Sequence, residues 1–301
     1  MPNGPVLSVV TPVYNGEHFV ARSYQCLRQQ TFEDWEWVVV NDGSTDRTLE
    51  ELRAIDDPRL QVTTYEANRG RGYARTTALA RARGRWIVVW DIDDLYFPDR
   101  LARVNQARIS NYDFMCSYAL VADNALNVKS VRGFHPESAY MPRYFIHPTL
   151  ACRAELARSL GYPAECRAGE DFTMVIGLAL NYRGDFVEDA LCVYQEDREI
   201  HLEKAIESNR NQLRQFRSFR REGTIRISPA SYGLALARWW GKIAALQLLR
   251  ATPRLYALTV VRRSSGETAP DWKLSEHRRE FLDSMRRAWP VSGGTGHAEI
   301  G

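Results

Sequence analysis

The sequence predicts an α/β fold, in which a mostly parallel sheet is flanked by helices and followed by a basic helical extension. Apolar, β-branched runs alternate with helical stretches through the first third of the chain. Repeated β–α–β units of this kind form parallel sheets that are covered on both faces. The charge is also divided, because residues 1–197 carry 21 Lys and Arg against 27 Asp and Glu, whereas residues 198–301 carry 19 against 10.

Seven elements are expected to alternate in the first third. Apolar runs predict strands, and apolar residues at helical spacing predict helices. In chain order we expect strand 6–11, helix 17–30, strand 35–40, helix 48–55, strand 60–65, helix 72–83 and strand 86–90. Pro12 is expected to end the first strand. Ligands of parallel sheets bind at the carboxyl ends of the strands, so the polar residues that follow these strands are functional candidates.

The pattern becomes less regular after residue 98. We expect helix 100–109, strand 112–120, an irregular or hairpin stretch at 123–142, helices 152–160 and 172–181, and strand 186–194. In the basic segment we expect helices at 199–223, 230–249 and 274–289, with a polar linker at 264–270. The chain is therefore divided into an α/β domain at 1–197, a helical extension at 198–289 and a Gly-rich tail at 290–301, for which disorder is expected.

The composition is typical of a soluble globular protein, since 45% of the 301 residues are apolar and 26% are charged. The five cysteines are odd in number and lack Cys-x-x-Cys spacing, which indicates reduced, mostly buried thiols of a cytoplasmic protein. The N-terminus lacks a secretory signal pattern. The most apolar stretch, 230–249, is interrupted by Arg238 and Lys242, so no membrane-spanning helix is expected.

Two carboxylates follow strand 86–90 in an Asp-x-Asp spacing. Side chains alternate along a strand, so Asp91 and Asp93 are expected to point to one side. Carboxylates at the end of a buried strand need a counter-charge. A hard divalent cation that carries a diphosphate supplies one, because such a metal takes its other ligands from phosphates and water. The alternative is an acidic turn at the surface.

Five short segments carry a family resemblance. They are Leu-Ser-Val-Val-Thr-Pro-Val-Tyr-Asn-Gly at 7–16, Val-Val-Val-Asn-Asp-Gly-Ser-Thr-Asp at 38–46, Asn-Arg-Gly-Arg-Gly-Tyr-Ala-Arg at 68–75, Asp-Ile-Asp-Asp at 91–94 and Glu-Asp at 170–171. In this order and spacing they resemble family 2 glycosyltransferases, whose GT-A fold is Rossmann-like, over about residues 6–197. Departures from the family pattern at Thr76, at 161–163 and at 177–180 leave the acceptor open.

The resemblance implies an inverting enzyme that uses a nucleotide-diphosphate sugar. The residues that it assigns to the nucleoside are Thr11, Pro12, Tyr14 and Asp42. The carboxylate of Asp42 can accept a hydrogen bond from the imide N–H of uracil, which favours a UDP-sugar, while GDP and TDP donors stay open. The alternative for Asp42 is a turn residue that bonds its own backbone.

Further residues are assigned to the phosphates and a metal. Arg75 is a donor-binding candidate because a guanidinium meets oxygens with two parallel N–H groups, and its alternative is a solvated helix face. Asp91 is expected near the ribose or a metal-bound water. Asp93 is expected to ligate a divalent metal, Mn²⁺ or Mg²⁺. The resemblance also implies His201 as a metal ligand, and the alternative is an exposed histidine.

Asp171 is the candidate general base, and Glu170 is expected to orient it or to contact the acceptor. Asp171 precedes the apolar helix 172–181, whose dipole favours the ionised carboxylate. On the acceptor side it would remove the hydroxyl proton as that oxygen attacks the anomeric carbon. The alternative is an acidic pair that caps the helix.

The expected reaction is transfer of a hexosyl or N-acetylhexosaminyl group to a saccharide or lipid-linked saccharide in polysaccharide or glycoconjugate biosynthesis. Nucleic acid is not among the expected partners. One alternative is a degenerate GT-A domain that binds nucleotide sugars as a scaffold. Another is a nucleotide-binding oxidoreductase, but Arg75 stands where a dinucleotide fingerprint needs Gly or Ala.

The amphipathic helix 230–249 raises a question of location. Its apolar face includes Tyr232 and Trp239, and Arg238, Lys242, Arg250 and Arg254 lie along or just past it. Such a helix can rest on the inner face of a membrane, with its aromatic residues near the headgroups. The alternative is that this face packs on the α/β core or on a partner subunit, so a homodimer stays open.

Overall fold

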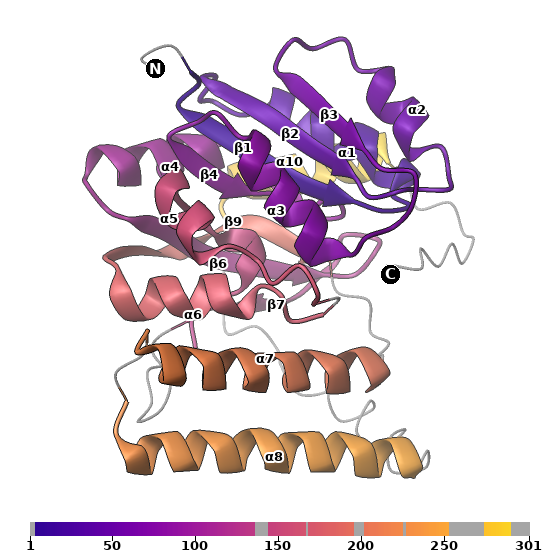
Figure 1. Cartoon of the computed structure of the whole chain (residues 1–301). Coiled ribbons are helices and arrows are strands. Elements are labelled where there is room, and N and C mark those ends of the chain that lie inside the picture. Colours follow the sequence, from indigo (N-terminus) through magenta and orange to yellow (C-terminus); the bar gives the residue numbers. More distant parts are fainter. Residues whose placement is uncertain are drawn as a thin grey trace.

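A curved sheet organises the chain, and the computed structural model describes residues 4–135, 144–166, 168–195, 202–224, 227–252 and 274–289. The strands are β1 (Leu7–Val13), β2 (Trp35–Asn41), β3 (Leu60–Thr64), β4 (Trp86–Val89), β5 (Leu95–Tyr96), β6 (Phe114–Ala122), β7 (Val128–Arg132), β8 (Ala151–Arg153) and β9 (Gly184–Gln195). Their order across the sheet is β3-β2-β1-β4-β8-β6-β9-β5, and β7 pairs with β6 at the side (Figure 1).

Helices cover both faces of this sheet. They are α1 (Glu17–Arg28), α2 (Thr48–Arg53), α3 (Arg71–Arg81), α4 (Arg100–Ile109), α5 (Ala154–Leu160), α6 (Phe172–Asn181), α7 (Leu202–Glu222), α8 (Pro229–Ala251) and α10 (Glu276–Ala288), with a 3-10 turn at His147–Thr149. Apolar side chains of α1, α2, α4 and α10 form one core cluster with the sheet. Those of α3, α5, α6, α7 and α8 form the other.

The first half of the sheet confirms the predicted parallel arrangement. Strand β1 pairs in parallel with β2 and β4, and β2 pairs in parallel with β3. All seven residues of β2 are buried, because alternate side chains enter opposite core clusters. Strand β1 continues through Pro12 to Val13, two residues beyond the predicted end at residue 11, so the expectation that Pro12 ends it was wrong.

The second half of the sheet is mixed and differs from the expectation. Strand β8 lies antiparallel between β4 and β6, and β5 pairs antiparallel with β9. The sequence suggested a helix from residue 152, but Ala151–Arg153 is a strand and α5 begins at Ala154. Strands of two or three residues are too short to show a periodic pattern, and pairing with their neighbours forms them. The stretch after residue 122 forms a hairpin between β6 and β7, one of the two forms expected.

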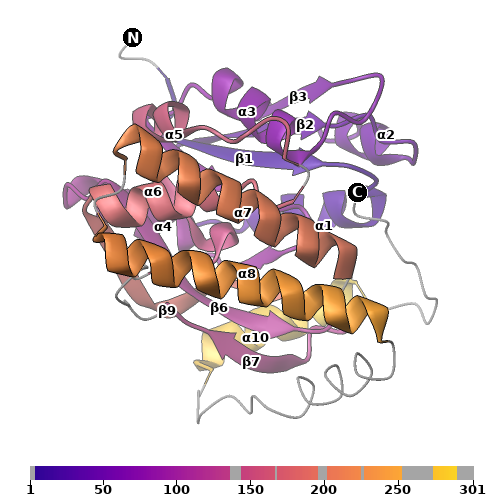
Figure 2. The same ribbon diagram turned by 60° about the horizontal axis from the view of Figure 1, so that its bottom comes forward.

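The basic C-terminal helices pack on the α/β core. In α10, Phe281, Leu282 and Met285 are buried, and Arg278 pairs with Asp189 of β9 at 2.6 Å. Figure 2 shows α7 and α8 on the opposite side of the sheet from α10. The predicted boundary at residue 197 and the tail at 290–301 lie outside the described residues, so the domain limits stay a prediction.

Helix α8 packs its predicted apolar face inward. Trp239 lies against Phe172 of α6 and Phe216 of α7, with ring centroids 5.6 and 4.7 Å apart. The apolar face that includes Trp239 therefore packs on the core, which is the alternative to membrane contact given above. In the described part of the chain, no helix is long and apolar enough to span a membrane. The five cysteines all lie in the described residues, none of them forms a disulfide, and all are buried, as predicted.

Candidate functional site

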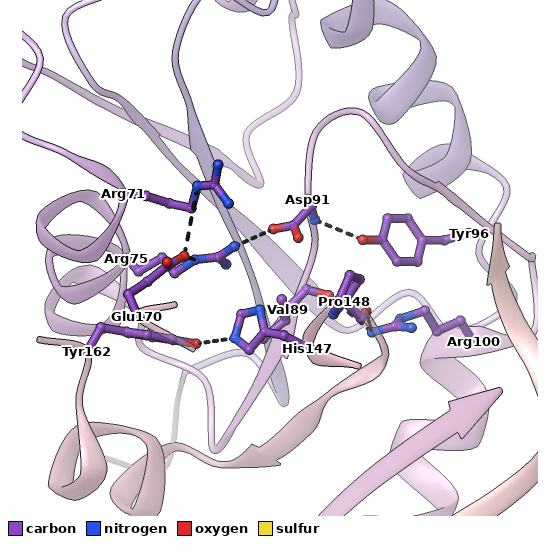
Figure 3. Close-up of polar contacts among 10 residues, drawn as sticks. All are labelled: Arg71, Arg75, Val89, Asp91, Tyr96, Arg100, His147, Pro148, Tyr162 and Glu170. Carbon is purple, nitrogen blue, oxygen red and sulfur yellow. Dashed lines mark hydrogen bonds and ion pairs between the residues drawn. The ribbon is translucent and has the colours of Figure 1, made fainter. Parts of the chain in front are cut away.

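A buried arginine joins the two predicted acidic motifs at the carboxyl edge of the parallel strands. Nη2 of Arg75, in α3, donates to Oδ1 of Asp91 at 2.8 Å. Its Nε donates to Oε1 of Glu170 at 3.3 Å, and Nε of Arg71 lies 3.8 Å from the same oxygen (Figure 3). Only 4% of Arg75 is exposed, so the alternative of a solvated helix face was wrong.

This arrangement controls the charge of Asp91. Burial works to raise the pKa of its carboxyl, but the Arg75 guanidinium, together with His147 and Arg71, outweighs burial and lowers that pKa below the usual value. A buried carboxylate that lost this guanidinium would be costly. Arg75 therefore keeps Asp91 ionised and ties α3, the end of β4 and the loop before α6 together.

The neighbouring carboxyls behave differently. Burial and the charge of Asp91 raise the pKa of Asp93, and burial and the charge of Asp93 raise that of Asp94 further. Asp94 accepts the backbone N–H of Gln195 at 3.0 Å through Oδ1, while its buried Oδ2 has no hydrogen-bond partner. The raised pKa values of Asp93 and Asp94 reflect a crowding of carboxyls that a divalent cation bound to one of them would relieve.

The protein would supply only part of the ligands of such a cation. Within the ranges that the structure describes, no three His, Cys, Asp or Glu side chains gather into a metal site. Asp93 is half-buried and fits as one ligand, with diphosphate and water as the others. His201 lies outside the described residues, and its predicted role stays untested.

Asp171 lies beside Glu170 at the N-terminal end of α6. Its side chain makes no capping hydrogen bond, which argues against the helix-capping alternative. Burial and the negative charge of Glu170 raise the pKa of Asp171 to about 6. The helix dipole was expected to favour the ionised carboxylate, but the pKa rises, because burial and Glu170 raise it more than Arg75 and Arg71 lower it. The resulting carboxyl loses and accepts a proton near neutral pH.

Helix α7 holds this acidic loop in place. Gln215 donates to the carbonyl oxygen of Gly169 at 2.9 Å and accepts the backbone N–H of Thr173 at 3.0 Å. Asn211 donates to the carbonyl oxygen of Ala168 at 2.9 Å. Gly169 has φ +72°, and a Cβ there would lie 2.8 Å from Oγ of Ser208. Sequence reasoning missed these residues, because Asn211 and Gln215 are identified only by their contacts with a loop about forty residues away.

The predicted nucleoside residues lie at the ends of β1 and β2. Thr11 is buried and accepts the indole N–H of Trp37 at 2.9 Å, whereas Pro12 and Tyr14 are half-buried. Asp42 accepts the backbone N–H groups of Arg69 and Gly70, each at 2.9 Å. It therefore holds a distant loop rather than its own turn. Burial raises the pKa of Asp42, although these two N–H groups oppose the rise.

A second polar pair lies beneath the Arg75 cluster. His147 is buried, and its Nε2 lies 2.8 Å from the hydroxyl of Tyr162. The guanidinium of Arg75 lies 5.6 Å from the ring centroid of Tyr162, and the Thr76 hydroxyl donates to the Tyr162 carbonyl at 3.2 Å. Two positions that depart from the family pattern, Thr76 and Tyr162, are thus in contact with each other.

Comparisons with known proteins agree with this geometry. The family described as Glycosyl transferase family 2 matches residues 8–144. The UDP-Glc:alpha-D-GlcNAc-diphosphoundecaprenol beta-1,3-glucosyltransferase WfgD of Escherichia coli is 32% identical over 128 residues, which are 42% of this chain and 51% of WfgD. The chain thus spans about half the length of that curated relative.

Solved structures extend the likeness in fold. TarS of S. aureus in complex with UDP-GlcNAc aligns with TM-score 0.61 and 21% identity over 93% of this chain and 83% of that chain. The mannosyltransferase PcManGT from Pyrobaculum calidifontis, in complex with GDP-Man and Mn²⁺, aligns with TM-score 0.57 and 19% identity over 94% and 84%. Residues 8–144 therefore match the family 2 glycosyltransferases that the motifs resemble, and the chain has the GT-A fold that those motifs predicted.

Proposed function

We propose that this enzyme transfers a sugar from a UDP-sugar to a hydroxyl group in a single, inverting displacement. The observation that carries the proposal is the buried Arg75, which binds Asp91 on the donor side and Glu170 on the other. Next to Glu170, Asp171 has a pKa near neutrality. The guanidinium of Arg75 thus connects Asp91, the proposed donor-binding carboxylate, to Glu170, the neighbour of the candidate base.

The surroundings of Asp42 support a donor whose base has an imide N–H, as uracil does. Each carboxylate oxygen of Asp42 accepts one backbone N–H and keeps a second lone pair. A lone pair of this kind would accept the imide N–H of uracil. WfgD is named as a UDP-Glc-dependent glucosyltransferase and TarS was solved with UDP-GlcNAc, whereas PcManGT was solved with GDP-Man. A UDP-sugar is therefore the proposed donor, and GDP-Man is the comparison to test.

A divalent metal, Mn²⁺ or Mg²⁺, would stabilise the charge that builds on the departing nucleotide. Asp93 would hold it, because its carboxyl is half-buried and crowded by Asp91. Oδ1 of Asp91 is occupied by Arg75, so its other oxygen is left for a ribose hydroxyl or a metal-bound water. The complex of PcManGT with Mn²⁺ supports this cofactor.

On the acceptor side, Asp171 is the proposed base. It would take the proton of the attacking hydroxyl while that oxygen bonds to the anomeric carbon and the nucleotide leaves. Only 2% of Glu170 is exposed, and two arginines hold it. Of the two roles expected for Glu170, orienting Asp171 is therefore favoured over contacting the acceptor.

We further propose a saccharide or lipid-linked saccharide as the acceptor, with a hexosyl or N-acetylhexosaminyl group as the sugar transferred. Support comes from the name of WfgD, which acts on a diphosphoundecaprenol-linked sugar. The enzyme would then act in polysaccharide biosynthesis.

A thermal-shift panel combined with a nucleotide-release assay tests the proposal. UDP-Glc, UDP-GlcNAc and GDP-Man are each added with and without Mn²⁺. We expect a UDP-sugar to raise the melting temperature only with metal, since a ligand of the native state stabilises in proportion to its occupancy. Slow metal-dependent release of UDP should accompany binding. Binding without release, even with saccharide acceptors, would favour the scaffold alternative.

A further inference from the structure

Helix α8 has a second apolar face, which points away from the protein. Its inner residues Ala235, Trp239 and Ile243 are buried. On the outer side, Leu234, Trp240 and Leu248 are 54%, 53% and 60% exposed. Figure 1 shows α8 as the outermost layer, with α7 between it and α6. Large exposed apolar residues that gather on one face of a helix indicate an interaction site.

Only apolar and small residues lie between these three side chains on the outer face. Leu234, Ala237, Gly241, Ala244 and Leu248 follow one another at spacings of three and four residues, which places them on one side of the helix, and all are exposed. A Cβ built on Gly241 meets nothing within 4 Å, so no described part of the chain covers this face. The outer face therefore runs uninterrupted along most of α8.

The borders of this face are basic. Helix α8 contains no acidic residue, and of its basic residues Arg250 pairs with Glu203 of α7 at 2.7 Å, which leaves Arg238 and Lys242 beside the outer face. Arg238 and Lys242 are exposed on one border, and on the other the guanidinium of Arg217 from α7 lies 5.6 Å from the ring centroid of Trp240. Two copies of this face would bring like charges together, whereas an anionic lipid surface attracts them.

We infer that the outer face of α8, formed by Leu234, Ala237, Trp240, Gly241, Ala244 and Leu248, docks on the interface of an anionic lipid membrane. Apolar side chains would enter the boundary between headgroups and acyl chains, and the basic borders would meet anionic headgroups. This is the face opposite to the one that the sequence suggested, because Trp239 is occupied by the core.

The helix that carries the docking face contacts the residue next to the candidate base. Trp239 contacts Phe172, which directly follows Asp171, and Phe216 of α7, the helix that holds the acidic loop. A helix with its side chains is roughly 10–12 Å across. A membrane bound to α8 would thus lie one helix away from the start of α6. The inference rests on surface chemistry alone and does not require the proposed donor or base.

Vesicle flotation of the full chain tests the inference without any substrate. The vesicles are phosphatidylcholine mixed with phosphatidylglycerol, and phosphatidylcholine alone serves as the neutral comparison. We expect binding to the anionic vesicles at low salt, weaker binding at high salt, and little binding to the neutral ones. The double variant Leu234→Glu/Leu248→Glu should reduce the bound fraction on the order of tenfold or more, because two apolar anchors become charged.

The matched control is Ile109→Glu. Ile109 is 61% exposed on α4, which belongs to the other core cluster, so this variant adds a carboxylate without touching α8. It should bind like the wild type, and an unchanged melting temperature checks that the α8 variant is folded. Absence of wild-type binding at low salt, or equal binding by the α8 variant, would overturn the inference. Self-association that the α8 variant abolishes, without vesicle binding, would instead assign the face to a second copy.

Discussion

The proposed donor half and the proposed acceptor half of the molecule build their sites in different ways. In the donor half, Thr11, Asp42 and Asp91 follow or end parallel strands that are adjacent in the sheet. In the acceptor half, Glu170 and Asp171 lie on a loop that α7 holds from below. The first site follows from strand topology, while the second depends on contacts between segments about forty residues apart. Substitutions in the two halves should therefore have different signatures.

The largest effect is expected on the donor side, at Asp93. Asp93→Ala removes the proposed metal ligand and should lower metal-dependent turnover about a thousandfold, since a bound metal contributes several kcal/mol to transition-state stabilisation. The measurement is UDP release over a range of Mn²⁺ concentrations, with circular dichroism to check the fold. Near-normal turnover at saturating Mn²⁺ would remove Asp93 from the metal site.

A smaller loss is expected at the base. Asp171→Asn keeps the size of the side chain but removes proton acceptance, so the transfer rate should fall on the order of a hundredfold or more. Single-turnover transfer to a saccharide acceptor measures it. A variant that transfers at the wild-type rate would show that another group takes the proton.

The pH profile separates Asp171 from its neighbour. Asp171 must be ionised to act, so kcat should fall as the pH drops below about 6. Glu170→Gln removes a negative charge that raises the pKa of Asp171, and the acidic limb should therefore move to lower pH. A limb that stays in place would mean that Glu170 does not influence the titrating group.

The same shift predicts the direction of a stability effect. The folded-state pKa of Asp171 is raised from 3.8, so its favourable contribution to stability is complete below 3.8 and is lost as the pH rises through about 6. At pH values above this window, Asp171→Asn should melt at a higher temperature than the wild type. Below it, the two should melt alike. Thermal denaturation in both ranges checks this.

The smallest effect is expected in α7. Gln215→Ala removes one hydrogen bond to the carbonyl oxygen of Gly169 in the acidic loop and two from Thr173, through its backbone N–H and its hydroxyl, and each buried bond contributes about 1 kcal/mol. We expect kcat to fall about tenfold, with donor affinity unchanged, if the loop then samples other positions. Gln212→Ala is the control, because Gln212 lies on the same helix and bonds only within it, to Ser208. Equal losses in both variants would mean that α7 acts through general stability.

The sequence predicted the parallel half of the sheet well because its signals are local. Strands such as β2 are continuous apolar runs, and the polar residues at their ends fall at one edge by topology alone. The sequence did not predict the burial of Arg75. Its partner Glu170 is 95 residues away, and no pattern within the helix 72–83 indicates that pairing. The same holds for Gln215, and for strands β5 and β8, which form only through pairing.

Calorimetric titration of the protein with one UDP-sugar, in the presence of Mn²⁺, most directly tests the assignment of Asp93 to donor binding and Asp171 to proton transfer. The titration compares the wild type, Asp93→Ala and Asp171→Asn. We predict that Asp171→Asn binds the donor with a Kd within about twofold of the wild type, since a general base acts on the acceptor proton. Asp93→Ala should bind far more weakly. If donor binding is instead lost in Asp171→Asn and kept in Asp93→Ala, the assignment of the two halves is contradicted.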